Sequence, residues 1–320
     1  MLTCSKLWPL MFGAAWLLSE AALAQTYPGK PIRFVVAFPA GSATDATARV
    51  VANHITRVSG VTVVVDNKAG ANGFLAAEAV AKSAPDGHTV LITTQTTHAI
   101  NPSVFRKLPY DPVREFIPVS PISRGAMLLV AAPGFPANNM AELTALAKAS
   151  PGKITFASGN MSSRAAGELY AAIAGVKLLH VPYKGAPQAL TDVAGGQVDL
   201  IWADSFIGLT QLKYGRVKAL GSTGAERIRT APGVHTMIEQ GFPGFELYAW
   251  SAAYFPAGTS SALVLQMSDW IKGAIRSDAA FFESGGGSSF HLSPADFARF
   301  QAKEIDLWAR IIKAAGVEPE

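Results

Sequence analysis

Short runs of β-branched residues alternate along this chain with alanine-rich segments whose apolar residues recur at helical spacing. This alternation is typical of an α/β protein with mainly parallel sheets. In the first third of the chain it predicts strands at 32–37, 61–66 and 88–94. It also predicts a helix that ends at Gly60, between the first two strands, and a second helix over 74–82.

The second half of the chain repeats the pattern. Asn139 is well placed to cap a helix over 140–149, because its side chain can accept a hydrogen bond from a free backbone N–H. A final helix is predicted over 293–315, with Pro294 near its first position and an apolar stripe along one side. Further strands are predicted at 154–157, 178–183, 198–203 and 217–221, and further helices at 165–174 and 189–193.

Two extended segments stand apart from this alternation. The segment 119–132 contains Pro121 and Gly125, so we interpret it as a crossing between two lobes rather than as one central strand. The aromatic-rich segment 247–255 is interpreted as the crossing back.

The two crossings predict a first lobe made of 25–122 and 251–320 and a second lobe made of 123–250. The chain is long enough for two domains of ordinary size, each with its own core. The glycine- and serine-rich segment 285–289 is predicted to be a flexible surface loop.

The first residues have the composition of a secretory signal peptide. Lys6 precedes an apolar run over 7–18 that is too short to span a bilayer, and Ala22-Leu23-Ala24 forms a cleavage site of the small-x-small type. We therefore predict a signal peptide over 1–24, cleavage before Gln25 and an exported mature protein. An uncleaved membrane anchor is the alternative.

Cysteine and charge narrow the functional classes. The only cysteine, Cys4, lies in the predicted signal peptide, which excludes disulfides, zinc-thiolate sites and cysteine nucleophiles from the mature chain. The net charge of +4 is small and the basic residues are scattered, which argues against nucleic-acid binding. The six histidines show no metal-ligand spacing, so no metal and no cofactor is predicted.

The most informative segment for ligand binding is 38–45, which leaves a predicted strand and opens a predicted helix. Small residues there allow backbone N–H groups to approach a ligand, and a helix N-terminus favours negative charge, so a carboxylate suits the site. The alternative is a tight turn in which Thr44 or Asp45 only caps the helix. The candidate ligand-binding residues are Phe38, Ala40, Gly41, Ser42 and Asp45.

A comparable segment, 157–164, lies between a strand and a helix of the predicted second lobe. Arg164 can engage a carboxylate through two parallel hydrogen bonds, or it can point to solvent. Ligands of open α/β sheets bind at the carboxyl ends of the strands, so both segments are expected to face one cleft. The candidates here are Ser158, Asn160, Ser162, Ser163 and Arg164.

Five further candidates lie at or after the ends of predicted strands: Thr94, Thr97, His98, Tyr183 and Asp204. Among the histidines, His98 is the best candidate for a hydrogen bond in the cleft. The chain lacks the serine-hydrolase elbow, the His-Glu-x-x-His zinc motif, the P-loop and the dinucleotide fingerprint. We therefore predict no catalytic residue and no enzymatic activity.

Short motifs follow one another along nearly the whole mature chain. They are Tyr27-Pro28 with Lys30-Pro31-Ile32, the segment 38–45 with Ala48-Arg49, Asp66-Asn67 with Ala69-Gly70, Ala84-Pro85-Asp86-Gly87, Thr97-His98 with Asn101-Pro102, Leu108-Pro109-Tyr110-Asp111-Pro112, Ala166-Gly167-Glu168-Leu169, Val181-Pro182-Tyr183-Lys184-Gly185 and Gly195-Gly196-Gln197-Val198-Asp199. This ordered series resembles the Bug-type substrate-binding proteins of the tripartite tricarboxylate transporter system.

The resemblance implies an α/β, type II periplasmic-binding-protein fold, in which two lobes joined by two crossing segments close on a ligand. In such proteins the segment that corresponds to 38–45 grips a ligand carboxylate through backbone amides and bridging water, and the segments at 158–164 and around Asp204 complete the pocket. Two departures stand out. This chain has Ser42-Ala43 where the family often has consecutive glycines, and Arg164 where it commonly has histidine, which would suit an anionic second group on the ligand.

These observations predict a non-enzymatic periplasmic protein that captures a dicarboxylate, tricarboxylate or aromatic carboxylate. It would act as a monomer and deliver its ligand to the membrane permease subunits of a tripartite tricarboxylate-type transporter. A ligand-sensing subunit for a membrane sensor kinase and an exported hydrolase are the alternatives.

Overall fold

The computed structural model describes residues 27–320. Within this range ten strands form one hydrogen-bonded sheet in the order β2-β1-β3-β9-β4-β7-β5-β6, with β8 and β10 both paired to β4. The strands are β1 (Ile32–Val36), β2 (Val63–Asn67), β3 (Thr89–Thr94), β4 (Phe116–Ala131), β5 (Thr155–Ser158), β6 (Leu179–Pro182), β7 (Leu200–Asp204), β8 (Lys218–Ser222), β9 (Tyr248–Pro256) and β10 (Gly287–Ser289). The predicted signal peptide and its cleavage site lie outside the described residues.

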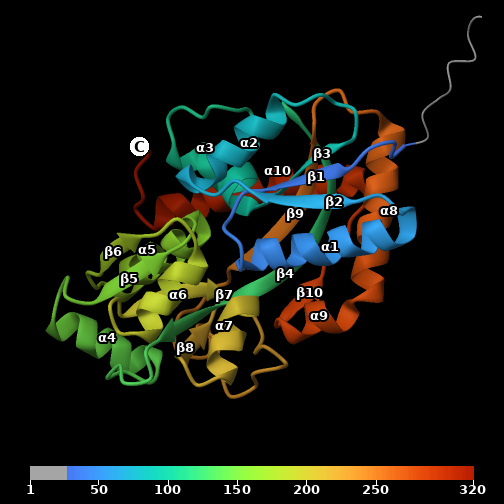
Figure 1. The fold of residues 1–320 in the computed structure, drawn as a ribbon. Coiled ribbons are helices and arrows are strands. Elements are labelled where there is room, and N and C mark those ends of the chain that lie inside the picture. Colours follow the sequence, from blue (N-terminus) through green and yellow to red (C-terminus); the bar gives the residue numbers. More distant parts are fainter. Residues whose placement is uncertain (1–26) are drawn as a thin grey trace, which may run out of the picture.

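Helices surround the sheet in two groups, one at each end of the long strand β4 (Figure 1). They are α1 (Ala43–Ser59), α2 (Phe74–Ala81), α3 (Asn101–Val104), α4 (Met140–Ala149), α5 (Met161–Ala174), α6 (Ala186–Ala194), α7 (Ser205–Lys213), α8 (Ser261–Ser277), α9 (Ala279–Ser284) and α10 (Pro294–Ala314), with short turns η1 (Ala71–Gly73) and η2 (Thr96–Ile100). In the described part of the chain, none of the helices combines the length and apolar character that crossing a membrane requires.

The first lobe is built on the parallel strands β2, β1 and β3, and β9 runs antiparallel beside β3. Side chains of β1 alternate between two buried faces. Phe34 belongs to an apolar cluster with residues of α1 and α8, and Val35 belongs to another with residues of α2 and α10. Helices therefore cover both faces of this sheet, as is usual for parallel strands.

The second lobe is built on the parallel strands β7, β5 and β6, and β4 runs antiparallel to β7 and β8. Leu128 of β4 belongs to a cluster with Ala189 of α6 and Ile207 of α7. The other face is covered by α4 and α5, which contribute Leu143 and Tyr170 to the cluster that also contains Val35.

Strands β4 and β9 connect the two lobes. They pair antiparallel from Phe116 and Pro256 to Ala126 and Tyr248, and β4 then continues into the second lobe beside β7. The segment 119–132 thus crosses between the lobes as one central strand, which the sequence interpretation had rejected. The prediction of mainly parallel sheets holds for the strands at the two ends of the sheet but not for its centre. Every strand paired to β4 is antiparallel to it.

The prolines of β4 do not break it because the strand bulges around them. Its register against β9 shifts between Pro118 and Ser120 and again between Pro121 and Ser123. The residues left without a partner at these shifts are Val119 and Ile122, each next to a proline, and the strand continues because a bulge interrupts the hydrogen-bond ladder only locally. The predicted lobe boundaries, after residues 122 and 250, fall inside β4 and β9 and stay a prediction.

The segment 285–289 is not the flexible surface loop that its composition predicted. Gly287–Ser289 forms β10, which pairs antiparallel with β4. A Cβ atom on Gly287 would lie 2.9 Å from the carbonyl oxygen of Arg124, so glycine is what allows this close approach. Helix α7 was also missed, because its apolar residues are spread around the helix rather than gathered on one side.

Several local predictions are confirmed. Gly60 ends α1 in a left-handed conformation with φ of 73°. Asn139 caps α4 by accepting a hydrogen bond from the N–H of Glu142. Ser293 caps α10, and Pro294 occupies its first position.

Candidate functional site

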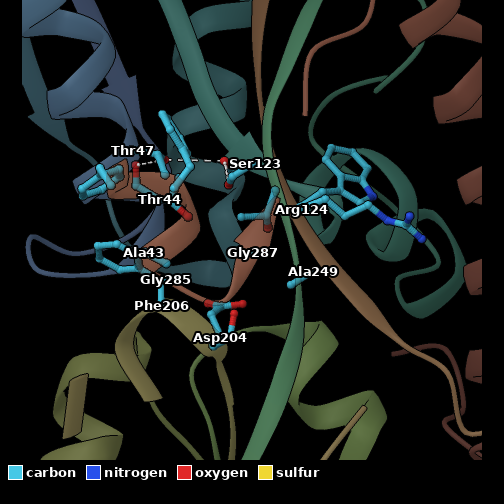
Figure 2. A pocket seen from close by; sticks show the side chains of 17 residues that line it. Ala43, Thr44, Thr47, Ser123, Arg124, Asp204, Phe206, Ala249, Gly285 and Gly287 are labelled. Carbon is cyan, nitrogen blue, oxygen red and sulfur yellow. Dashed lines mark hydrogen bonds between the residues drawn. The ribbon is translucent and has the colours of Figure 1, made fainter. Parts of the chain in front are cut away.

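A cavity lies where the two lobes meet. Its wall comes from the N-termini of α1 and α7, from the connecting strands β4 and β9, and from α9 and β10 (Figure 2). It is partly open to solvent, and the space free of protein atoms, open solvent included, amounts to about 500 Å³. The lining residues are Ala43, Thr44, Thr47, Thr94, Ser123, Arg124, Gly125, Asp204, Ser205, Phe206, Ala249, Trp250, Ser251, Phe281, Phe282, Gly285 and Gly287.

Helix α1 starts in the cavity wall because a tight, capped turn precedes it. Gly41 has a φ of 80°, which favours glycine, and the Ser42 hydroxyl accepts a hydrogen bond from the N–H of Asp45 at 3.2 Å. The Asp45 carboxylate in turn accepts hydrogen bonds from the Gly41 N–H and the Asn67 amide. Burial alone would raise the pKa of Asp45, but these bonds and the Arg49 guanidinium hold it below its ordinary value. Asp45 is therefore ionised, and its carboxylate stabilises the turn through these hydrogen bonds.

The first turn of α1 offers free backbone donors to the cavity. The N–H groups of Ala43 and Thr44 have no hydrogen-bond partner among the residues that the structure describes, and both residues line the cavity. Such N–H groups carry the partial positive charge of a helix N-terminus. An anionic group is therefore favoured at this place.

Helix α7 presents a second N-terminus from the other lobe. It begins directly at the end of β7, and its first two residues, Ser205 and Phe206, line the cavity. Asp204 occupies the N-cap position, but its side chain does not cap the helix. Two helix N-termini from different lobes thus meet at one cavity.

Hydroxyl groups form a chain along the floor of the cavity. The Ser123 and Ser251 hydroxyl oxygens, on the two connecting strands, lie 2.8 Å apart, and the Thr47 hydroxyl lies 3.5 Å from that of Ser251. Figure 2 shows Thr47 and Ser123 on the side of the cavity opposite Asp204. Because a hydroxyl both donates and accepts, these groups can reorient to suit a ligand.

Asp204 is the charged side chain that faces the cavity (Figure 2). Burial raises the pKa of its carboxyl to about 6, so it is mostly ionised at neutral pH. Arg124 also contributes to the wall, but its guanidinium extends away from the cavity and lies 4.1 Å from the ring centroid of Tyr248. The cavity therefore holds a carboxylate without a cationic side chain beside it.

The rest of the wall is apolar. Phe206 of α7 and Phe281 of α9 have ring centroids 4.8 Å apart, and Phe282 lies beside them in the wall. Apolar rings in a wall of this kind can keep water from the carbon skeleton of a molecule bound beside them.

The sequence model of one protein family, described as the tripartite tricarboxylate transporter family receptor, matches residues 47–317, which are most of the described chain. The chain belongs to this receptor family. BugT of Bordetella pertussis is 33% identical over 300 residues, which are 92% of each chain. The structure of R. palustris Rpa4515 with adipate has a TM-score of 0.89 at 31% identity and covers 92% of this chain and 100% of that one. MatC from Rhodopseudomonas palustris with bound malate has a TM-score of 0.85 at 28% identity, over 89% of this chain and 100% of that one.

These matches confirm the predicted Bug-type receptor family. The periplasmic binding protein BugD, with a TM-score of 0.88 at 31% identity, confirms the two-lobed α/β binding-protein fold. The family is one of substrate-binding receptors rather than of enzymes. Among residues 27–320, no three histidine, cysteine, aspartate or glutamate side chains gather in a group suited to a metal ion.

In this tripartite tricarboxylate receptor, Thr94 and Asp204 are the predicted site residues that line the cavity. Phe38 and Tyr183 instead line a second groove of about 670 Å³ between 70–73 of the first lobe and 182–184 of the second.

The other predicted residues of the first segment shape the start of α1 rather than the cavity wall. Gly41, Ser42 and Asp45 build the turn, and Ala40 is exposed to solvent. The alternative had named Thr44 or Asp45 as the cap of this helix, whereas the N-cap residue is Ser42. The backbone N–H groups that lack a partner belong to the next two residues, Ala43 and Thr44.

The polar side chains of the second segment bond to one another and to their own lobe. The Ser158 hydroxyl lies 2.7 Å from Nε2 of His180. Asn160 caps α5, where its side-chain oxygen accepts hydrogen bonds from the Ser162 hydroxyl and the Ser163 N–H. None of these residues lines the cavity described above.

Arg164 lies outside the cavity wall and has a partner of its own. Its guanidinium donates a hydrogen bond of 2.8 Å to the carboxylate of Glu320. Glu320 is held to the first lobe by backbone bonds with Val104 and Arg106. The predicted contact of Arg164 with a second ligand carboxylate therefore has no support in this arrangement, in which Arg164 links the second lobe to the C-terminus.

His98 and Thr97 are fully buried beneath the first lobe. The His98 ring stacks on Tyr254 with centroids 3.9 Å apart, and its Nδ1 lies 2.8 Å from the Thr97 hydroxyl. Burial lowers the pKa of His98 to about 3, so the ring is neutral. Neither residue reaches the cavity wall.

Sequence reasoning missed the residues that the connecting strands and the α9–β10 segment bring to the cavity. These are chiefly Ser123, Ser251, Phe281, Phe282 and Gly287. The signal available was the pair of crossing segments, since residues at a lobe junction necessarily border the space between the lobes.

Proposed function

We propose that this protein is a periplasmic receptor that captures a small carboxylate between its lobes and delivers it to the membrane permease subunits of a tripartite tricarboxylate-type transporter. The observation that carries the proposal is the meeting of two helix N-termini, one from each lobe, at a cavity where the N–H groups of Ala43 and Thr44 have no partner in residues 27–320. Affinity comes from these donors acting in an enclosed, partly apolar site.

The similar structures support the ligand class. Adipate accompanies Rpa4515 and malate accompanies MatC, and both are dicarboxylates. The proposed ligands of this receptor are a dicarboxylate, a tricarboxylate or an aromatic carboxylate. The proposed protein is monomeric and is exported with removal of residues 1–24.

Binding is proposed to close the lobes 25–122 with 251–320 and 123–250 on each other. The lobes touch at Pro39 and Gly185, where a Cβ atom on Gly185 would lie 2.5 Å from the proline ring. This contact supports a closed arrangement in which the glycine permits the approach. Two lobes joined by two strands provide the two-state element that a ligand can bias.

A thermal-shift and calorimetry screen tests the function. The panel contains malate, adipate, citrate and benzoate together with the corresponding amides. A carboxylate present at about a hundred times its Kd should add about 2.7 kcal/mol to the free energy of unfolding, because it binds the folded state alone. The amides should fail, since a helix N-terminus favours negative charge. Equal binding of acids and amides, or binding of neither, would contradict the proposal.

Delivery to a transporter has its own test. Membrane vesicles that contain the permease subunits should take up the identified ligand only when the purified receptor is added. Uptake at the same rate without the receptor would separate ligand binding from transport and refute the second half of the proposal.

A further inference from the structure

Asp204 lies where its carboxylate can bind a ligand in the cavity. It ends β7 and occupies the N-cap position of α7, where an aspartate usually accepts a hydrogen bond from the helix. Here it makes no such bond, and no hydrogen bond from residues 27–320 lowers the pKa of its carboxyl. Figure 2 shows the side chain directed into the cavity, opposite Thr44 and Thr47.

No cationic side chain neutralises Asp204 from the cavity wall. Arg124 and Asp204 are the two ionisable residues among the 17 that line the cavity, and the Arg124 guanidinium lies over Tyr248, away from the cavity. Strand β9 contributes Ala249, Trp250 and Ser251, none of which is ionisable.

The charged groups of the neighbouring helices are already paired. On α1, the Arg49 guanidinium lies 3.0 Å from the carboxylate of Asp45. On α9, Glu283 faces Arg229 at 3.6 Å. No cationic side chain of α1, α9, β4 or β9 is therefore paired with Asp204.

This charge discriminates between ligand classes. A second carboxylate on a ligand would be enclosed with a like charge at low effective dielectric constant, which is unfavourable. A protonated nitrogen would instead form a charge-assisted hydrogen bond with a carboxylate that otherwise lacks a partner. The free N–H groups of Ala43 and Thr44 still require an anion at the other end of the cavity.

We propose that the cavity binds a zwitterion, with its carboxylate at the N-terminus of α1 and a cationic nitrogen at Asp204. This inference rests on the proposed carboxylate-binding function, but in place of the dicarboxylate proposed above it favours an amino acid whose two charges lie at opposite ends. Asp204 is then the residue that determines specificity.

The pH dependence of affinity follows from the same contact. The carboxyl of Asp204 takes up a proton as the pH falls through about 6, because burial raises its pKa. A zwitterion then loses its charged partner, so its affinity falls with decreasing pH. A dicarboxylate shows the opposite trend, because protonation removes the repulsion.

The experiment is calorimetric titration of the mature protein with three length-matched sets of ligands. They are β-alanine, malonate and propionate; γ-aminobutyrate, succinate and butyrate; and δ-aminovalerate, glutarate and valerate. In the set whose length fits, the zwitterion should bind most tightly. Asp204→Asn should weaken that zwitterion roughly 10- to 150-fold, the range of a charge-assisted hydrogen bond, and should strengthen the dicarboxylate. The control Asp306→Asn, at an exposed position of α10, should change none of these affinities.

The outcomes distinguish this inference from the function on which it rests. A wild-type protein that binds a dicarboxylate more tightly than the matched zwitterion, with affinity that rises as the pH falls, overturns the inference and leaves carboxylate binding intact. If no carboxylate binds, either in these sets or in the broader panel, both fail together. A zwitterion whose affinity is unchanged by Asp204→Asn also overturns the inference.

Discussion

Replacing Asp204 by asparagine should stabilise the ligand-free protein at neutral pH. The carboxyl has its pKa raised from 3.8 to about 6 by burial. Between these values the folded state binds a proton that the unfolded state has released, so the free energy of unfolding falls as the pH rises through this window. Each unit of pKa corresponds to about 1.4 kcal/mol, so the ionised carboxylate, which is only partly buried, destabilises the fold by at most about 3 kcal/mol above the window. Asparagine has nearly the same shape and removes this charge without removing a hydrogen bond.

Urea unfolding of dialysed protein, followed by tryptophan fluorescence, measures the effect. Asp204→Asn should have a free energy of unfolding higher than wild type by about 1 to 3 kcal/mol at about pH 8, and nearly the same at about pH 4. The corresponding rise in Tm at the higher pH is roughly 5 °C. The exposed control Asp306→Asn should stay within about 0.5 kcal/mol of wild type at both pH values. A variant no more stable than wild type at the higher pH would refute the reasoning that this carboxylate lacks a partner.

Three further perturbations test other parts of the structure. Gly185→Ala places a methyl group against Pro39, so saturating ligand should leave a larger radius of gyration by X-ray scattering than in wild type; Gly134→Ala, where a Cβ meets nothing within 4 Å, should close normally. Gly41→Val forces a β-branched residue to a φ of 80° and should lower both the free energy of unfolding, by more than about 1 kcal/mol, and the ligand affinity in calorimetry. Arg164→Ala breaks a partly exposed ion pair, so stability should fall by about 0 to 1 kcal/mol while affinity stays unchanged; a large loss of affinity would place Arg164 in the site after all.

Most of the helices and strands could be predicted because short stretches of sequence determine them. Alternating buried residues such as Phe34 and Val35 identify a strand covered on both faces, and caps such as Asn139 identify where helices begin. The failures occurred where tertiary context overrides composition. Proline in β4 predicts a strand break, but bulges within β4 itself keep the strand paired with β9. A glycine-rich segment such as 285–289 predicts a loop, but here its glycine allows close pairing with β4.

The site was predictable in part for the same reason. A strand that leads into a capped helix places free N–H groups at the edge of a sheet. The segment 38–45 has the small and polar residues of such a strand-to-helix turn. Which residues face the cavity depends on how far the turn extends, and the donors proved to be those of Ala43 and Thr44 rather than those of the turn itself. Ser123 and Ser251 could not be found, because they lie 128 residues apart and meet only through the pairing of β4 with β9.

The pairing of β4 with β9 also has a mechanical consequence. Ser123 faces Ser251 and Gly125 faces Ala249 across this ladder, and all four residues belong to the cavity wall. In the proposed closing motion the ladder is what bends, so a ligand touches the hinge itself rather than a remote surface of each lobe. In that motion, the size of the bound molecule would bear directly on how far the two strands bend. A membrane partner that measures the separation of the lobes would thereby distinguish one cargo from another without ever touching it.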